Sequence, residues 1–236
     1  MGAQHGYGQI VTDGLVLYLN AADSQSYPGT GTTWFDLSGN GNDGTLTNGP
    51  TFDSGNKGSI VFDGVNDRIT TPILYDTWHT HNWTLDAWLK YDNVQSDDAF
   101  FEMSRVSTSG NWGLNTVTRA GNLYFYWVGT SGAGHVLSSS EISNGNLFNI
   151  SITFNAPGGT PSQSDLYNNT TTYINGQLVS HIAAGSASIT SAGQLTIGGV
   201  LYPFQGNIYS FKYYERVVSP QEILQNYNAT KSRFNL

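Results

Sequence analysis

The sequence has no cysteine and little charge. Cysteine is absent from all 236 residues, so the chain can form no disulfide, no zinc site with cysteine ligands and no thiol nucleophile. Charged residues make up 11% of the chain, against about 25% in an average soluble protein. Asn, Ser, Thr and Gly must therefore supply most of the polar surface, which is typical of strands and turns rather than of solvent-facing helices.

The charge that is present is mostly negative, with a formal net charge of −8. No run of Lys and Arg occurs, so we expect no binding to nucleic acid or to an anionic membrane surface. No stretch approaches the roughly 20 apolar residues of a membrane-spanning helix. The N-terminal stretch MGAQHGYGQIVTDG has neither a basic segment nor a long apolar core, so no secretory signal is expected.

Short segments of alternating or continuous apolar residues follow one another along the chain, separated by turns rich in Gly, Asn and Ser. About ten of them predict strands, at residues 14–19, 58–64, 83–91, 99–105, 122–129, 147–155, 166–174, 177–184, 193–200 and 206–215. Many short strands at this spacing are typical of a β-sandwich or barrel. Asn175-Gly176 joins two of these segments and predicts a two-residue hairpin turn.

One helix is predicted, at residues 219–228. Ser219 can cap its N-terminus, Pro220 suits its first turn, and Glu222 completes a capping box. The face expected to pack on a sheet consists of Ile223, Leu224 and Tyr227.

No segment has the composition of an interdomain linker, so we predict a single domain over residues 14–236. An N-terminal arm at residues 1–13 precedes it. The arm contains several glycines, and we expect it to become ordered only on a partner.

Five runs, in this order, resemble the concanavalin A-like lectin/glucanase superfamily, and in particular its laminin-G-like jelly-roll domains. They are DLSGNGNDGTL (36–46), SIVFDGVND (59–67), WTLDAWLK (83–90), YINGQLV (173–179) and GNIYSFKYYERVVSPQEILQNYN (206–228). The resemblance covers about residues 14–229. It implies an all-β fold, an antiparallel two-sheet jelly-roll sandwich with one short C-terminal helix. It also implies that the glycine-rich stretch at 35–52 is an ordered loop.

The start pattern GLVLYL…AADSQSYPGTGTTWFDLSGNGN is similar to single domains encoded by tailed bacteriophages, cyanophages among them. That resemblance implies a virion structural protein. The absence of cysteine and of a signal peptide agrees with it, because phage proteins assemble in the host cytoplasm.

Catalysis is not expected. Glucanases in this superfamily carry two carboxylates on one strand, close enough for a retaining mechanism. The glutamates here do not pair in that pattern, and they are Glu102, Glu141, Glu215 and Glu222. The five histidines are scattered and no Gly-x-Ser-x-Gly sequence occurs, so a serine hydrolase is not indicated either.

A structural calcium ion is the one cofactor that the sequence suggests. Asp36, Asn40, Asn42 and Asp43 place oxygen donors in one tight loop, and oxygen is the ligand that calcium takes. The alternative is that Asx turns alone explain this composition.

A sugar site would need exposed aromatic rings beside amide and hydroxyl groups. The candidate residues lie in segments expected to be loops, and they are Trp78, His79, His81, Trp112 and Tyr202. The alternative is ordinary packing, which is expected for Trp83 and Trp88 because both flank an alternating strand pattern.

The favoured interpretation is a non-enzymatic virion structural protein that decorates a capsid or forms part of a tail or fibre. It would bind other virion proteins and itself, with a trimer as the expected homo-oligomer, and would adhere to host glycans through its lectin-like domain. The alternative is a free-standing carbohydrate-binding lectin module. A glycoside hydrolase is the third and least favoured hypothesis.

Overall fold

The computed structural model describes residues 8–75, 80–94, 97–107, 110–119, 121–128, 133–137, 140–158, 168–179, 182–184 and 193–236. Within these residues, no helix has the length and apolar character needed to cross a membrane.

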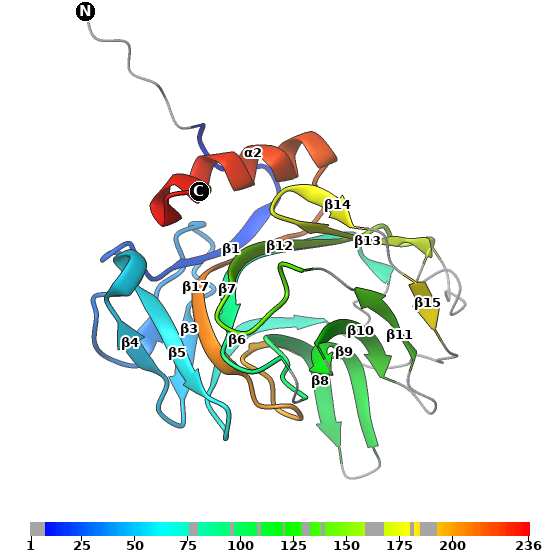
Figure 1. Ribbon diagram of the computed structural model, residues 1–236, viewed down its shortest axis with the longest axis horizontal. Coiled ribbons are helices and arrows are strands. Elements are labelled where there is room, and N and C mark those ends of the chain that lie inside the picture. The colour runs from blue at the N-terminus through cyan, green and yellow to red at the C-terminus, as the bar shows by residue number, and fades with distance from the viewer. Residues whose placement is uncertain are drawn as a thin grey trace, which may run out of the picture.

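Two antiparallel sheets form the body of the protein (Figure 1). Across the eight-stranded sheet the order is β14 (Gln177–Val179), β13 (Thr170–Ile174), β12 (Leu147–Phe154), β7 (Trp83–Tyr91), β17 (Gln205–Tyr214), β5 (Ser59–Asp63) and β4 (Thr51–Asp53), with β1 (Leu15–Asn20) also paired to β17. Across the nine-stranded sheet the order is β15 (Ile182–Ala184), β11 (Ala133–Leu137), β10 (Asn122–Val128), β9 (Gly110–Arg119), β8 (Phe101–Ser107), β16 (Gly193–Ile197), β6 (Arg68–Tyr75), β3 (Gly44–Thr47) and β2 (Thr33–Trp34).

The predicted fold class is confirmed: an all-β, antiparallel two-sheet jelly-roll sandwich with one C-terminal helix. One predicted strand is wrong, because residues 177–184 belong to β14 in one sheet and β15 in the other. An alternating pattern shows which side chains share a face, but it does not show where the chain changes sheets. Six further strands were missed, since they are short, contain a proline, or are interrupted by Gly, Asn or Thr; they are β2, β3, β4, β6, β9 and β11.

The main core lies between the two sheets. Strand β7 shows why it forms: Trp83, Leu85 and Leu89 lie on one face of the strand and are fully buried. The Trp83 ring stacks on Phe154 at 5.7 Å and on Tyr213 at 6.4 Å between ring centroids. The expectation that Trp83 belongs to the core is therefore confirmed.

The other face of β7 is also buried, because helix α2 (Pro220–Thr230) lies across the outer side of the eight-stranded sheet (Figure 1). Trp88 points to this side and is fully buried, as expected, but beneath the helix rather than between the sheets. Its ring stacks on Tyr227 with a centroid distance of 5.6 Å. A second, smaller hydrophobic cluster forms here from Val11, Leu15, Tyr173, Tyr214, Val218 and Ile223.

Helix α2 begins as the sequence predicts. The Ser219 side chain accepts from the Glu222 backbone N–H, and the Glu222 side chain accepts from the Ser219 N–H, so both halves of the capping box form. The predicted packing face is partly wrong, since Leu224 is 39% exposed while Asn226 is buried. The observed face follows helical spacing through Ile223, Asn226, Tyr227 and Thr230. A 3₁₀ turn, η3 (Lys231–Phe234), continues the chain, and another, η1 (Gly55–Lys57), lies near it.

The segment at residues 8–13 differs from the expected arm. The Val11 N–H donates to Asn226 Oδ1 at 2.8 Å, and the Val11 carbonyl accepts from Tyr214 Oη at 3.1 Å. Asp13 pairs with Arg216 at 2.9 Å. These six residues therefore pack on their own domain, while residues 1–7 lie outside the described part of the chain.

Candidate functional site

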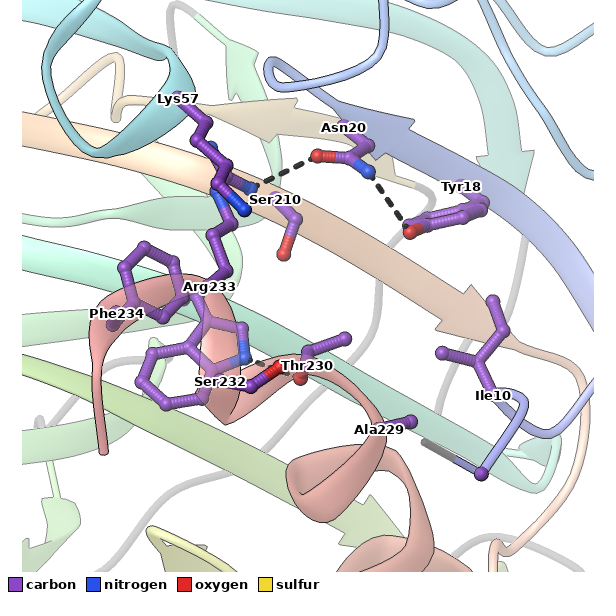
Figure 2. A pocket seen from close by; sticks show the side chains of 12 residues that line it. Ile10, Tyr18, Asn20, Lys57, Ser210, Ala229, Thr230, Ser232, Arg233 and Phe234 are labelled. Atoms are coloured by element: carbon purple, nitrogen blue, oxygen red, sulfur yellow. Dashed lines mark hydrogen bonds between the residues drawn. The ribbon is translucent and has the colours of Figure 1, made fainter. Parts of the chain in front are cut away.

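A pocket of about 280 Å³ lies between the outer face of the eight-stranded sheet and the C-terminal end of the chain (Figure 2). We call it the C-terminal pocket. It is lined by Gly8, Ile10, Tyr18, Asn20, Lys57, Trp88, Ser210, Ala229, Thr230, Ser232, Arg233 and Phe234. Strands β1, β7 and β17 form its base, and the end of α2 together with η3 forms one wall.

A bulge in β17 turns two consecutive side chains toward this pocket. The register of β17 against β7 shifts between Ile208 and Ser210, and such a shift places an extra residue on one strand and re-aims its side chains. The Tyr209 ring then contacts Phe234, with ring centroids 5.3 Å apart. Ser210 lines the pocket and is only 3% exposed.

The Ser210 hydroxyl is a buried polar group that the fold leaves open to a ligand. Figure 2 shows it directed into the space between β1 and η3. No hydrogen bond joins it to another protein group in the described residues, and because the hydroxyl lines the pocket it can bond to water or to a ligand there.

Two β1 side chains supply further polar groups beside Ser210. Asn20 Nδ2 donates to Tyr18 Oη at 3.1 Å, and Asn20 Oδ1 accepts from Arg233 Nη1 at 2.9 Å (Figure 2). Since the Tyr18 oxygen acts as an acceptor in the first of these bonds, its own proton is left to donate; it has no acceptor in the described part of the chain. The pocket therefore offers both hydroxyl and amide groups at fixed positions.

Arg233 closes one end of the pocket and ties η3 to the turn at η1. Its Nε donates to the Asn56 carbonyl at 3.0 Å, and its Nη2 donates to the Gly58 carbonyl. Nη1 donates to Asn20 and, at 3.3 Å, to the Tyr209 carbonyl. All of these acceptors are neutral, and no carboxylate in the described residues forms an ion pair with Arg233. Burial lowers the pKa of Arg233 to about 10, so the side chain is still a cation at neutral pH.

The aromatic residues around the pocket are held rigidly. Trp88 Nε1 donates to Thr230 Oγ1 at 2.8 Å, and the Phe234 ring lies 4.5 Å from the Trp88 ring between centroids. Phe234 is half-buried, so part of its surface faces solvent at the rim. A rigid aromatic rim beside fixed polar groups is the general design of small-molecule sites.

One row along the sheet from the pocket lies a buried ion pair. Asp86 on β7 is directly opposite Lys212 on β17, and Asp86 Oδ1 is 2.6 Å from Lys212 Nζ, with both side chains at most 1% exposed. Ser151 Oγ on β12 donates to the other Asp86 oxygen at 2.7 Å. Burial lowers the pKa of Lys212, but the Asp86 carboxylate outweighs burial, and the net effect is a raised pKa.

A second pocket contains one of the predicted sugar-site residues. We call it the His81 pocket; it measures about 540 Å³ and is lined by Thr80, His81, Asn82, Ala156, Gly158 and Glu215. His81 is exposed, and its Nδ1 lies 3.2 Å from Thr80 Oγ1. Trp78 and His79, the neighbouring candidates, lie outside the described residues.

Of the other two predicted sugar-site residues, Tyr202 lies far from His81. Tyr202 lies in the loop before β17, and His81 lies just before β7, which runs antiparallel to β17. The 9 residues of β7 span roughly 30 Å at about 3.3 Å per residue, so the two side chains are at opposite ends of the sandwich. Trp112 was expected in a loop, but it lies in β9, opposite Arg105 of β8.

Asp36, the first predicted calcium ligand, holds its loop together by accepting hydrogen bonds. Its Oδ1 accepts from the Tyr18 and Ser38 backbone N–H groups, both at 2.8 Å. Its Oδ2 accepts from Ser38 Oγ at 2.7 Å and from the Asn42 N–H at 3.0 Å. The carboxylate thus faces hydrogen-bond donors, and a cation at the same place would compete with them.

The other predicted calcium ligands also form hydrogen bonds with backbone groups. Asn40 and Asn42 donate through Nδ2 to the carbonyls of Leu15 and Val16 at 3.1 and 2.7 Å. Asp43 Oδ1 accepts from the Asp36 N–H at 2.8 Å. The described residues contain no cluster of three His, Asp or Glu side chains that could hold a metal. Asx turns and these cross-links are sufficient to explain the ordered loop.

Glu102 and Glu222 have structural contacts. Glu102 on β8 is fully buried, and its Oε1 accepts from the Leu201 and Tyr202 backbone N–H groups at 3.0 and 3.4 Å. Glu222 binds Arg216 through both oxygens, at 2.7 and 3.0 Å. Each therefore anchors a loop or a helix end.

The C-terminal pocket was missed by sequence reasoning. Its residues come from six separate segments, and the bulge that turns Ser210 into the pocket leaves no mark in the alternating pattern of β17. Arg233 was the one available signal, because a cation is uncommon in a chain with only 9 Lys and Arg residues.

Several solved structures share this fold. The binding domain of botulinum neurotoxin serotype D superposes with a TM-score of 0.66 at 14% identity, covering 93% of this chain and 53% of that chain. The binding domain of Paraclostridial Mosquitocidal Protein 1 gives a TM-score of 0.64 at 17% identity, covering 95% of this chain and 53% of that chain. Trypanosoma rangeli sialidase in complex with sialic acid gives 0.63 at 14% identity, covering 93% and 33%.

These similarities define a fold, the two-sheet β-sandwich. The chain spans about half of the two toxin binding domains and about a third of the sialidase, at identities that establish the fold alone. None of the curated proteins matches the sequence. A laminin G family model, described as the Concanavalin A-like lectin/glucanases superfamily, matches residues 63–224. The chain therefore belongs to the concanavalin A-like lectin/glucanase superfamily, as a laminin-G-type domain.

Proposed function

We propose that this domain binds carbohydrate, and that the C-terminal pocket is the binding site. The observation that carries the proposal is the Ser210 hydroxyl, which is buried, directed into the pocket and without a partner in the described residues. A ligand rich in hydroxyl groups would complete its hydrogen bonding, since a sugar hydroxyl both donates and accepts.

The remaining groups in the pocket suit the same ligand. Tyr18 can donate its hydroxyl proton, Asn20 has a second amide hydrogen, and Phe234 provides an apolar rim. The volume of about 280 Å³ lies just below the roughly 300–1,000 Å³ of sites for drug-sized ligands. One or two sugar rings are therefore the expected size of the bound portion.

The test is ligand binding by Ser210→Ala, with His81→Ala as the matched control in the other pocket. Sugars found on a glycan array would be titrated calorimetrically against the wild-type domain and both variants. Losing one hydrogen bond to a buried hydroxyl should weaken binding about 5- to 20-fold. His81→Ala should leave binding unchanged. Loss of binding in His81→Ala, with normal binding by Ser210→Ala, would move the site to the His81 pocket.

A virion structural subunit is the second candidate function. The similarity of the start pattern to phage-encoded domains favours it. In that role the chain would associate with itself, with a trimer expected, and with other virion proteins, and it would bury well over about 1,000 Å² against them. Deleting residues 1–7 leaves the contacts of Val11 and Asp13 intact and should block incorporation into particles. Purified particles that never contain this chain would contradict the candidate.

Both candidates are non-enzymatic. Release of reducing ends from laminarin or agarose by the purified domain would contradict them. Calcium binding by the loop of Asp36 stays a prediction, and its check is the melting temperature with and without a chelator, because a ligand that binds only the folded state raises that temperature.

A further inference from the structure

The C-terminal pocket has a charge opposite to that of the whole protein. The chain carries a formal net charge of −8, but the pocket is lined by two cations, Lys57 and Arg233, and by no Asp or Glu. Lys57 makes no ion pair within the described residues and is exposed at the rim. The pocket is therefore a local positive region on an acidic domain, where a bound anion would be stabilised.

We propose that the C-terminal pocket selects a ligand that carries an anionic group, a carboxylate or a sulfate on a sugar ring, with Arg233 and Lys57 as the residues that determine this selectivity. The inference rests on the proposed carbohydrate site and specifies the chemistry of its ligand.

The hydrogen bonds of Arg233 leave one N–H donor available to such a group. Its contacts with Asn56, Gly58, Asn20 and Tyr209 use four of the five N–H donors that a guanidinium has. One Nη2 N–H is left over in the described structure. These four bonds hold the guanidinium in place but do not neutralise it, since every acceptor is neutral. An anion that accepts the last N–H would add a charge-assisted hydrogen bond to a side chain that is already ordered.

Lys57 is placed beside Arg233 by an uncommon backbone conformation. Asn56 and Lys57 both have positive φ, 49° and 67°. Asn tolerates this conformation, but lysine is disfavoured in it, so turn propensity does not account for lysine at this position. Its flexible ammonium group can reach an anion at the mouth of the pocket without disturbing the contacts of Arg233.

The neighbouring lysines provide a built-in control. Lys212 lies on the same sheet face, but Asp86 neutralises it at 2.6 Å. Lys231 lies in η3 and sits over the Tyr227 ring at 5.2 Å, and it does not line the pocket. Substituting Lys231 removes the same charge from the same region as substituting Lys57, but outside the proposed site.

The experiment compares pairs of sugars that differ only in charge. Glucose with glucuronate, galactose with galacturonate, and sodium sulfate alone would be titrated against the wild-type domain, Lys57→Gln and Lys231→Gln by ligand-observed NMR. The acidic sugar of a pair should bind at least about fivefold more tightly at low ionic strength, and the difference should shrink at about 0.5 M NaCl. Lys57→Gln should weaken acidic ligands about two- to fivefold and leave neutral sugars unchanged. Lys231→Gln should behave as wild type.

The outcomes separate this inference from the proposed function. Equal affinity for acidic and neutral sugars would overturn the inference while the carbohydrate site stands. Sulfate binding that depends on Lys57, without binding of any sugar, would support the anion site and remove the carbohydrate proposal. An equal loss in Lys57→Gln and Lys231→Gln would overturn the inference, because the effect would then come from general surface charge. No binding by any ligand would overturn both.

Discussion

Two cations lie on the outer side of the eight-stranded sheet, Lys212 fully buried and Arg233 half-buried, and their partners differ. Lys212 is fully buried and lies 2.6 Å from Asp86, whose second oxygen is bonded to Ser151. Arg233 is held by four bonds to neutral oxygens and contacts no carboxylate within the described residues. Tyr18 and Asn20 lie between the two side chains. The Lys212 ammonium lies over the Tyr18 ring, and Asn20 is hydrogen-bonded both to the Tyr18 hydroxyl and to Arg233.

The pKa values of the two side chains are shifted in opposite directions. Burial lowers the pKa of both cations, but for Lys212 the Asp86 carboxylate reverses the shift, whereas for Arg233 the pKa remains lowered to about 10. A neutralised cation inside the protein contributes to a unique packing arrangement and has little left to offer a ligand. A cation that is ordered but not neutralised, beside an open pocket, can still bind an anion. The comparison thus distinguishes a structural charge from a candidate functional one.

The largest effect should come from breaking the neutralised pair. Asp86→Ala leaves the Lys212 ammonium buried without a counter-charge, and it also removes the acceptor for Ser151. We expect a loss of about 3–5 kcal/mol in the free energy of unfolding. Urea unfolding followed by tryptophan fluorescence measures it.

Removing both charges should restore much of that loss. The double variant Asp86→Leu with Lys212→Met has no uncompensated charge and keeps most of the packing, so it should unfold within about 1–2 kcal/mol of wild type. A double variant as unstable as Asp86→Ala would show that packing around this pair, and not its charge, sets the stability.

Substitution of the other cation should have a smaller effect. Arg233→Met loses the bonds to the carbonyls of Asn56 and Gly58, but it leaves no buried charge behind. Asn56 lies in an exposed turn where water can replace the guanidinium, whereas Gly58 is buried and its carbonyl loses this partner. We expect a loss of about 1–2 kcal/mol in the same urea experiment. A loss as large as that of Asp86→Ala would mean that Arg233 is chiefly structural, and the distinction between the two cations would fail.

The sequence was sufficient to predict the strand that carries Lys212 and the helix that precedes Arg233. Alternation in β7 placed Trp83 and Trp88 in buried positions, and the capping residues Ser219 and Glu222 located the start of α2 within one residue. These features depend on local periodicity and on contacts between residues three positions apart, which a single sequence records directly. The family motifs added the sandwich topology.

The site could not be predicted in the same way. Ser210 enters the pocket because β17 bulges, and a bulge changes which side chains share a face without changing the sequence pattern that predicts a strand. Arg233 reaches Asn20 and Gly58 across more than 170 positions of sequence. The aromatic loop residues attracted attention instead, yet His81 and Tyr202 lie at opposite ends of the sandwich. Residue type suggested a sugar site, but only three-dimensional proximity could show where polar groups converge.

A third cation, Arg216, is partly exposed and is paired with a carboxylate. Glu222 accepts two hydrogen bonds from Arg216 and also bonds to Ser219, and the Arg216 contact lowers the pKa of Glu222 from 4.5 to about 2. A carboxylate with a lowered pKa stabilises the fold above its unfolded pKa and loses that contribution as pH falls through its folded pKa. Stability from this pair should therefore be complete above about pH 4.5 and lost between about pH 4.5 and 2.

Glu222→Ala should reduce the free energy of unfolding at pH 7 by about 1–1.5 kcal/mol, less than either buried substitution, because the pair is partly exposed and the change removes one helix cap. Its difference from wild type should fall to about half as the pH approaches 2, because the protonated Glu222 side chain can still cap the helix. Glu222→Gln keeps a capping side chain and should lose about half as much. A difference from wild type that stays constant down to pH 2 would show that the charge on Glu222 does not contribute.

The smallest effect on stability is expected at Lys57, where the distinction between structure and function is sharpest. Its side chain is exposed and forms no ion pair within the described residues, so Lys57→Gln should change the free energy of unfolding by less than about 0.5 kcal/mol in urea. The same variant should lower the rise in melting temperature that sodium sulfate produces, whereas Lys231→Gln should keep the wild-type rise. Stability that falls markedly in Lys57→Gln would place Lys57 with Lys212, as a charge that the fold itself requires. If Lys57→Gln keeps its stability but gains less from sulfate, one face of the sheet carries both kinds of cation. Lys212 is then neutralised within the protein, and Lys57 is left for a ligand.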